Sequence, residues 1–175
     1  LLKGKNIGKS ENWIKKNVLP LKNYEAWAHF YLGVILKAQN KTSESQKHFN
    51  KVLEHINAER LSPTEFIALF QEHHLPEYAT KVISNVRVQL GNPNILLLEM
   101  AALAQEAGDN ELMVREIVKH IAFLRNKDLI QSTMNEYLKT DEQLEIFERV
   151  IYEHIQNNPN QAVYNEILIT HLIQK

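Results

Sequence analysis

The sequence predicts an all-α protein in which antiparallel helical hairpins stack into a right-handed superhelix. Two related breaks indicate this fold, because Gly91-Asn92-Pro93-Asn94 and Asn157-Asn158-Pro159-Asn160 each close one amphipathic segment and open another. They lie roughly 66 residues apart, close to twice 33, and a spacing in the low thirties with helical periodicity on both sides is typical of helix–turn–helix arrays. Between them, Ala107-Gly108-Asp109-Asn110 makes a different break. Such arrays are binding scaffolds more often than enzymes.

The first 23 residues form a predicted basic lead-in. Residues 1–22 hold six lysines and one glutamate, a net charge of +5. Ser10 can cap a short helix that runs to about Leu19, and Pro20 ends it. A lysine-rich terminus is usually a solvated tail, and the alternative is that it binds acidic surfaces or anionic lipid.

The first full hairpin is expected over residues 24–58. Its first helix, Tyr24 to Asn40, is apolar on several faces, which is typical of a helix packed between neighbours. After the break at Asn40-Lys41-Thr42-Ser43, the second helix runs to about Ala58 and has a narrower apolar stripe. A wide stripe followed by a narrow one indicates a sandwiched helix and a helix with an outer face.

The same two-helix unit is expected to recur through residues 24–175, about four and a half times. Later helices are predicted at 62–74, 76–90, 94–107, 110–124, 128–138, 141–157 and 161–175, with 128–138 and 141–157 as the fourth pair. The last helix is expected to expose Ile167, Leu168, Leu172 and Ile173, because no following helix is predicted to cover them. We therefore expect that the natural protein is longer, or that the chain self-associates through residues 161–175.

Residues 26–175 resemble the tetratricopeptide repeat family, whose pattern is a Trp, Leu-Gly and Tyr in the first helix and Ala, Phe and Pro in the second. The matching residues are Leu32-Gly33, Leu36 and Phe49 in the first unit, Met100-Ala101, Ala104, Met113 and Ile117 in the third, and the terminal prolines Pro93 and Pro159. His29 stands at the place of the pattern's Trp. The second unit matches poorly because its inter-helix turn is short, which leaves its register open by one or two residues.

The resemblance implies a superhelix that holds a peptide or helix of a partner protein on its concave face. The expected partner-binding residues, apolar at one end and polar at the other, are Trp27, Phe30, Val34, Lys37, Phe66, Phe70, Leu98 and Glu136. For Trp27 and Phe30 the alternative is packing in the core. The family's clamp for a C-terminal carboxylate, made by Lys and Asn in successive first helices, has no counterpart here, so that co-chaperone role is disfavoured.

No cofactor and no metal are expected. His73-His74 is the one sequence cluster of histidines, but adjacent rings on a helix point about 100° apart and suit a polar helix end better than one ion. His48, four residues after Glu44, is expected in a solvated pair, and His120 and His154 occupy equivalent sites, which favours packing. Phosphate-binding loops, Gly-x-Ser-x-Gly and H-E-x-x-H are absent from the sequence, so an enzyme is not predicted.

The composition argues against a nucleic-acid-binding protein and against a membrane-spanning one. The formal net charge of −1 disfavours nucleic-acid binding, and the longest apolar runs are too short for a membrane span. The chain has no cysteine, which fits a reducing cytosol or an export route that avoids thiols and so leaves the compartment open: a soluble protein of the cytoplasm or, with an upstream signal, of the periplasm. The predicted function is a non-catalytic protein–protein interaction module or scaffold. The alternatives are a structural spacer or oligomerisation arm, an RNA-binding helical-hairpin repeat protein, and an enzyme whose active domain lies elsewhere.

Overall fold

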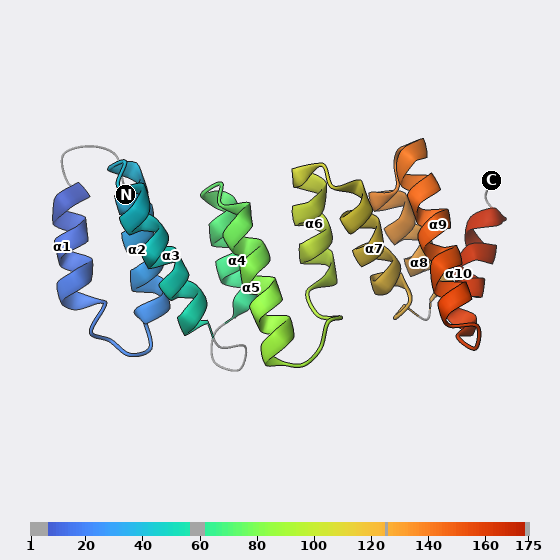
Figure 1. Ribbon diagram of the computed structural model, residues 1–175, viewed down its shortest axis with the longest axis horizontal. Helices are drawn as coiled ribbons and strands as arrows, with labels where there is room; N and C mark the ends of the chain where they lie inside the picture. Colours follow the sequence, from blue (N-terminus) through green and yellow to red (C-terminus); the bar gives the residue numbers. More distant parts are fainter. Residues whose placement is uncertain (1–6, 57–61, 125, 174–175) are drawn as a thin grey trace. The chain divides into compact units, whose positions relative to one another are not determined.

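The protein is all-α, as the sequence predicts. A computed structural model describes residues 7–56, 62–124 and 126–173, apart from the side chain of Ile7, and within these ranges it contains ten helices and no strand (Figure 1). The lead-in over residues 1–6, the predicted helix end at Ala58 and the last two residues of 161–175 lie outside the described residues.

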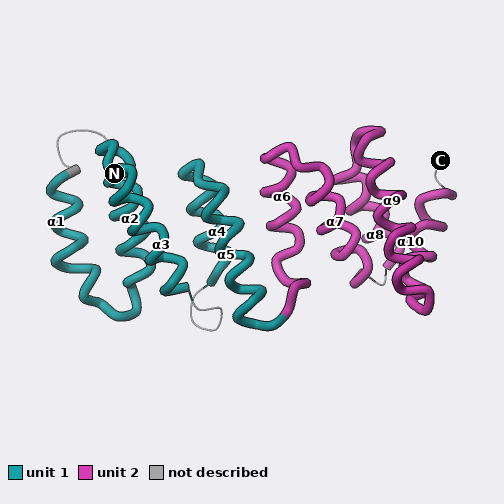
Figure 2. The backbone as a smooth tube through the Cα atoms, in the orientation of Figure 1, with its two compact units in different colours: residues 1–91 teal, residues 92–175 magenta. Residues whose placement is uncertain are grey.

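The helices group into two compact units, residues 1–91 and residues 92–175 (Figure 2). The boundary falls in the break at Gly91-Asn92-Pro93-Asn94, which the sequence predicts as the end of a helical pair. The basic helix of the lead-in belongs to the first unit, where it packs on the helix that follows it.

The first unit contains five helices: α1 (Ile7–Asn17), α2 (Glu25–Ala38), α3 (Thr42–His55), α4 (Pro63–Glu72) and α5 (Pro76–Gln89). The α2/α3 and α4/α5 pairs are closely packed hairpins, and α3 also packs on α5. α1 begins three residues before Ser10, so Ser10 is not its cap. Pro63 and Pro76 occupy the first positions of α4 and α5. The N–H of a residue at this position makes no hydrogen bond within the helix, so proline, which has no N–H, is tolerated there.

The second unit contains α6 (Leu97–Ala107), α7 (Asn110–Ile121), α8 (Lys127–Tyr137), α9 (Asp141–Asn157) and α10 (Ala162–Leu172). Asp109, Asn126 and Thr140 cap α7, α8 and α9 with side-chain oxygens. α6 and α7 form a hairpin, whereas α9, predicted to pair with α8, packs chiefly on α7 and α10.

The turns within the α2/α3, α4/α5 and α6/α7 hairpins have the same backbone geometry. Asn40, His74 and Gly108 follow α2, α4 and α6 and have the positive φ angles of 61°, 54° and 73°. Each follows the last by about 34 residues, the length of one helix–turn–helix repeat. In each turn the next residue donates its N–H to a carbonyl five residues back: Lys41 to Leu36, Leu75 to Phe70 and Asp109 to Ala104, at 2.8–2.9 Å. This is a Schellman-type helix end, which needs a left-handed residue at the turn.

Buried side chains recur along the sequence at the same spacing as the turns, about 34 residues. Four sets of four side chains, equivalent in register, are all buried: Leu32, Leu36, Ser45 and Phe49; Phe66, Phe70, Ala79 and Ile83; Met100, Ala104, Met113 and Ile117; Met134, Leu138, Phe147 and Ile151. The second set fixes the register of the hairpin whose match to the repeat pattern is poorest. Its turn is not short, because His74 takes the place that Asn40 and Gly108 hold in the neighbouring turns.

Candidate interaction surface

The eight predicted partner-binding residues do not share one exposed face. Six lie in the first unit and two, Leu98 and Glu136, lie in the second. Phe30, Val34, Phe66 and Phe70 are buried, Trp27 and Leu98 are half-buried, and Lys37 and Glu136 are exposed.

The buried aromatic residues belong to the core of the first unit. Phe30 of α2 packs edge-on against Phe70 of α4 at 5.1 Å between ring centroids, and Phe70 stacks on Tyr78 of α5 at 5.4 Å. Phe49 of α3 contacts the Phe30, Phe70 and Tyr78 rings. The prediction that Phe30, Phe66 and Phe70 form a binding face is therefore wrong, since side chains without exposed surface cannot contact a partner. The alternative, core packing, is correct for Phe30.

Trp27 and Lys37 retain surface at the two ends of α2. The Trp27 ring lies 4.9 Å from the ring of Phe66, so it covers the core of the first unit with one face. The Lys37 ammonium lies 3.5 Å from the carbonyl oxygen of His73 at the C-terminal end of α4. Cations at that end of a helix complement its partial negative charge, and Lys37 stays exposed while it makes this contact.

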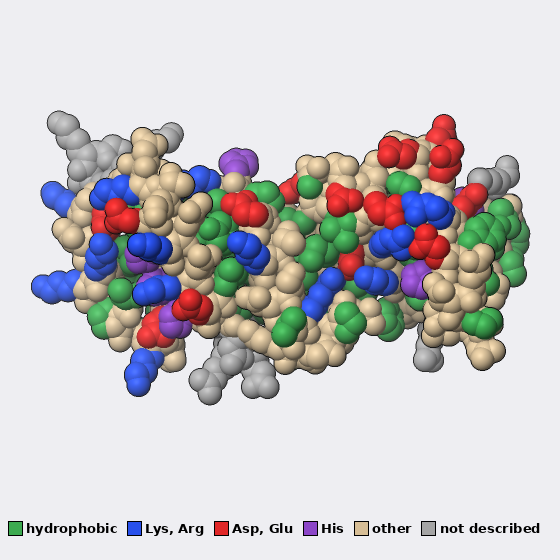
Figure 3. Space-filling view, in the orientation of Figure 1, with side chains coloured by type: hydrophobic (Ala, Val, Ile, Leu, Met, Phe, Trp, Pro, Cys, Tyr) green, Lys and Arg blue, Asp and Glu red, His purple; other side chains and the backbone are tan. Residues whose placement is uncertain are grey.

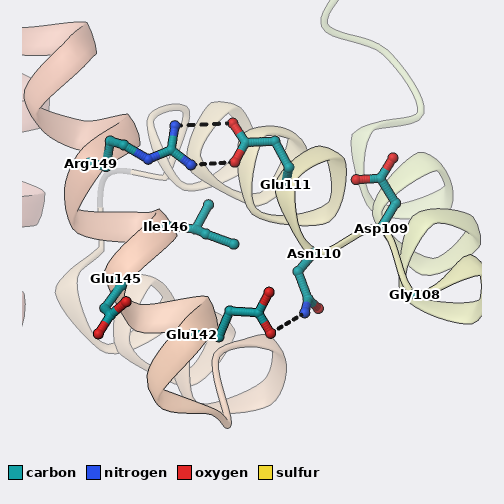
Figure 4. Close-up of a pocket in the computed structure, with 8 residues that line it drawn as sticks. All are labelled: Gly108, Asp109, Asn110, Glu111, Glu142, Glu145, Ile146 and Arg149. Carbon is teal, nitrogen blue, oxygen red and sulfur yellow. Dashed lines mark hydrogen bonds and ion pairs between the residues drawn. The ribbon is translucent and has the colours of Figure 1, made fainter.

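A polar hollow of about 620 Å³ opens in the second unit between the α6–α7 turn and α9 (Figure 4). Its walls are made by Gly108, Asp109, Asn110 and Glu111 on one side and Glu142, Glu145, Ile146 and Arg149 on the other. The turn brings the backbone there because Gly108 adopts φ of 73° and Asp109 caps α7 by accepting from the Leu112 N–H at 2.9 Å. The two sides of the hollow are joined by a hydrogen bond of 3.0 Å, which Nδ2 of Asn110 donates to Oε2 of Glu142.

A second hollow, of about 480 Å³, continues along α9 and shares Glu145 and Arg149 with the first. It adds Glu148, the exposed ring of Tyr152, Glu153 and Gln156. Together we name these two hollows the α9 groove. It offers six carboxylates and one arginine, with apolar surface at Ile146 and Tyr152. The α9 groove is therefore an acidic surface with apolar patches. It was not predicted from the sequence.

An ion-pair ring holds one wall of the α9 groove in place. Arg115 of α7 contacts Glu111 at 2.7 Å and Glu153 at 2.8 Å, and Arg149 of α9 contacts the same two carboxylates. The hydrogen bond from Arg149 is the chief reason that the pKa of Glu111 lies below its ordinary value. The hydrogen bond from Arg115 does the same for the pKa of Glu153. Two of the six carboxylates are thus paired with arginine, and Glu148 is bonded to Nε2 of His171 at 2.8 Å, so Asp109, Glu142 and Glu145 carry most of the remaining acidic character.

A histidine cluster joins α2 and α3 in the first unit. The Nδ1 atoms of His29 and His48 lie 2.9 Å apart in a hydrogen bond, and the ring of His55 stacks on His29 at 5.5 Å between centroids. Glu25 lies 3.3 Å from Nδ1 of His55. Histidine side chains lie among lysines over α2 and α3 (Figure 3). The expectation that His48 is a solvated partner of Glu44 is wrong, because His48 is half-buried against His29.

Burial is the main influence on the cluster's protonation. Burial, and after it the charges of His48, Lys51 and His55, lower the pKa of His29 to about 4. The pKa of His48 is also lowered, first by burial and then by Lys15 and Lys51, while Glu11 and Glu44 oppose this shift. The sequence offered one signal for the cluster, which is the seven-residue spacing that places His48 and His55 on one face of a helix.

The other predicted histidine sites are structural. His74 is the exposed left-handed residue of the α4–α5 turn, and His73 packs edge-on against Phe30. His154 stacks on Tyr164 at 4.4 Å, and burial lowers the pKa of both His120 and His154. Within the described residues, no three His, Asp or Glu side chains converge as ligands for a metal ion.

The predicted self-association surface is narrower than expected. Ile167 is 0% exposed and Leu168 packs on the core of the second unit, so neither belongs to an open patch. Ile169, Leu172 and Ile173 are exposed, Ile173 by 79%. Over the parts of the chain described, no helix combines the length and apolarity that crossing a membrane requires.

Comparison of the chain with protein-family models, with curated proteins and with solved structures found no match.

Proposed function

We propose that the chain is a non-catalytic protein-interaction module, a right-handed superhelix of stacked helical hairpins similar to tetratricopeptide repeats. One observation supports it most: equivalent buried positions and equivalent left-handed turns recur at one constant spacing. That spacing, about 34 residues, is the length of a tetratricopeptide repeat. Repeats of this kind bury their apolar faces against neighbours and offer pre-ordered helices to a partner, so little of the receptor must be fixed on binding.

The partner we propose is a protein segment with basic and apolar side chains, bound along the α9 groove. Residues 92–175 hold thirteen Asp and Glu against seven Lys and Arg, a net charge of −6. Within the groove, Asp109, Glu142 and Glu145 would face the cations of such a segment, and Ile146 and Tyr152 offer apolar contact. Complementary charge would steer the segment to the groove and make binding sensitive to salt.

Fluorescence anisotropy with a labelled peptide that alternates lysine and leucine tests this proposal. Binding should be salt-dependent and should fall by at least tenfold in the Glu142→Lys, Glu145→Lys double variant. The matched control is Asp128→Lys, Glu136→Lys, which makes the same charge change at two exposed positions of α8, outside the groove. Equal losses in the two double variants would mean that overall acidity, and not the groove, attracts the peptide.

A second candidate function is self-association through α10. The exposed Ile169, Leu172 and Ile173 support it, because three large apolar side chains on one short segment favour contact with another apolar surface. The light-scattering experiment given in the Discussion distinguishes this candidate from a monomeric module.

A further inference from the structure

We propose that the His29–His48 pair, with His55 stacked on His29, is an acid-sensitive latch: at neutral pH it closes the α2–α3 hairpin, and protonation of both rings releases it. The proposal is independent of the partner-binding function. It concerns the most closely packed helix pair of the first unit, in which His29 is only 5% exposed.

The hydrogen bond itself limits how many protons the pair can hold. A bond between two Nδ1 atoms requires one ring to donate its N–H and the other to accept with a bare nitrogen. When the accepting nitrogen takes a proton, two N–H groups face each other at 2.9 Å and the hydrogen bond is lost. The closed hairpin therefore tolerates one imidazolium at most, and the second proton binds only when the rings separate.

The surroundings do not compensate a second positive charge. Lys51 and His55 of α3 and Lys15 of α1 add positive charge near the pair. Glu11 of α1 and Glu44 of α3 favour protonation of His48, but Glu11 is already bonded to Lys15 and Gln39.

Three further charged or titratable groups contact other side chains of the first unit. Glu25 of α2 lies against His55. From α4 and α5, His73 and Tyr78 contact the phenylalanine rings. None of these three groups is among the charges that shift the pKa of His29 or His48.

Release would act on the neighbouring core. His29 and His48 each precede a buried phenylalanine, Phe30 and Phe49, and both rings belong to the aromatic core shared with α4 and α5. Separation of α2 from α3 at the histidines would thus give water access to an apolar interface that is closed at neutral pH.

The direction of the pH effect follows from linkage. The pKa of His29 is about 4 in the closed hairpin and about 6.5 when the ring is exposed, so the open form binds more protons between these values. Opening becomes more favourable as pH falls from 6.5 toward 4, and the His29 shift alone raises the opening equilibrium by up to about 30-fold at about pH 5.

Amide hydrogen exchange on the full chain, corrected for the intrinsic pH dependence of exchange, tests the latch. Between about pH 8 and pH 5, protection of α2 and α3 should fall by roughly tenfold or more. His29→Asn cannot titrate, and its amide can donate to neutral His48 or accept from protonated His48, so the variant should hold its protection at pH 5. The matched control His74→Asn makes the same change at an exposed histidine and should respond to acid as the parent does. An equal acid response in His29→Asn and the parent would overturn the proposal.

Histidine side-chain NMR on the parent protein decides the matter if His29→Asn does not fold. The proposal requires that the His29 and His48 rings titrate as a coupled pair, with the second proton binding only as α2 and α3 lose protection. If both rings titrate independently near the ordinary histidine value while the hairpin stays protected, no latch exists.

Discussion

Phe49 of α3 lies so close to Gly33 of α2 that a methyl group on Gly33 would come within 2.6 Å of the ring carbon Cδ1 and 2.9 Å of Cζ. Ser45, one turn before Phe49, donates its hydroxyl to the carbonyl oxygen of Gly33 at 2.8 Å. The two contacts fix the distance between α2 and α3. They give a physical reason for a glycine at position 33 and a phenylalanine at position 49.

Gly33→Ala should destabilise the protein by about 1–3 kcal/mol, because the buried Phe49 ring must move to admit the methyl group. The control is Gly8→Ala in α1, where no atom lies within 4 Å of the added carbon and alanine is the better helix former. Urea unfolding of both variants checks this. If Gly33→Ala is as stable as Gly8→Ala, the hairpin is not limited by this contact.

His74→Gly should stabilise the protein by roughly 1 kcal/mol, because His74 has a left-handed φ of 54° that glycine adopts without steric cost. Gly108→Ala places a side chain at the equivalent turn, φ of 73°, and should destabilise by a similar amount. Thermal unfolding of the two variants measures both effects. Changes of the same sign would contradict the equivalence of the two turns.

Phe147→Ala should cost about 3–5 kcal/mol, since the ring is 0% exposed at the α9 position that repeats Met113. Phe123→Ala is the matched control in the same unit, because Phe123 is 64% exposed and its loss should cost under about 0.5 kcal/mol. Chemical denaturation gives both values, and comparable costs would place Phe147 outside the core.

Leu172→Glu with Ile173→Glu should reduce self-association without unfolding the chain, because both side chains are exposed and the buried Ile167 is unchanged. Light scattering on parent and variant at matched concentration makes the comparison. A parent that is monomeric at high concentration would remove self-association as a candidate function.

Stability should decrease as pH falls below about 6.5, the ordinary pKa of histidine. The pKa of His154 is lowered by burial and then by Arg115 and Lys119, so the unfolded chain binds a proton that the folded chain resists. The stability that neutral His154 contributes is thus present above about pH 6.5 and is lost as pH falls toward its folded pKa. His154→Gln should flatten the pH dependence measured by urea unfolding between pH 7 and pH 5, and an unchanged slope would show that His154 titrates normally.

Most helices were predictable because their ends use local signals. Pro63, Pro76 and Asp109 mark starts within one residue of those observed. The start of α6 was predicted at Asn94, three residues early. The Asn92 side chain accepts from the Asn94 N–H at 2.9 Å and Leu96 is left-handed at φ of 54°, a turn that apolar periodicity does not reveal.

The surface was less predictable than the helices. An apolar stripe shows that a helix packs, but it does not show whether the stripe meets a neighbouring helix or a partner, and Phe30 and Phe70 proved to be core. His29 and His48 are far apart in sequence and meet only because α2 and α3 fold back on each other. The α9 groove depends on how α9 packs on α7, which a register of helical pairs does not specify.

The equivalent turns at Asn40, His74 and Gly108 bear on how such a chain can change length. A recombination event that joins one of these turns to the next would add or remove about 34 residues, which comprise the second helix of one hairpin and the first helix of the next. The sequence of every later helix would be unchanged, so each helix would keep the same apolar face. An insertion within a helix whose length is far from a whole number of helical turns would instead rotate the apolar stripe away from the core.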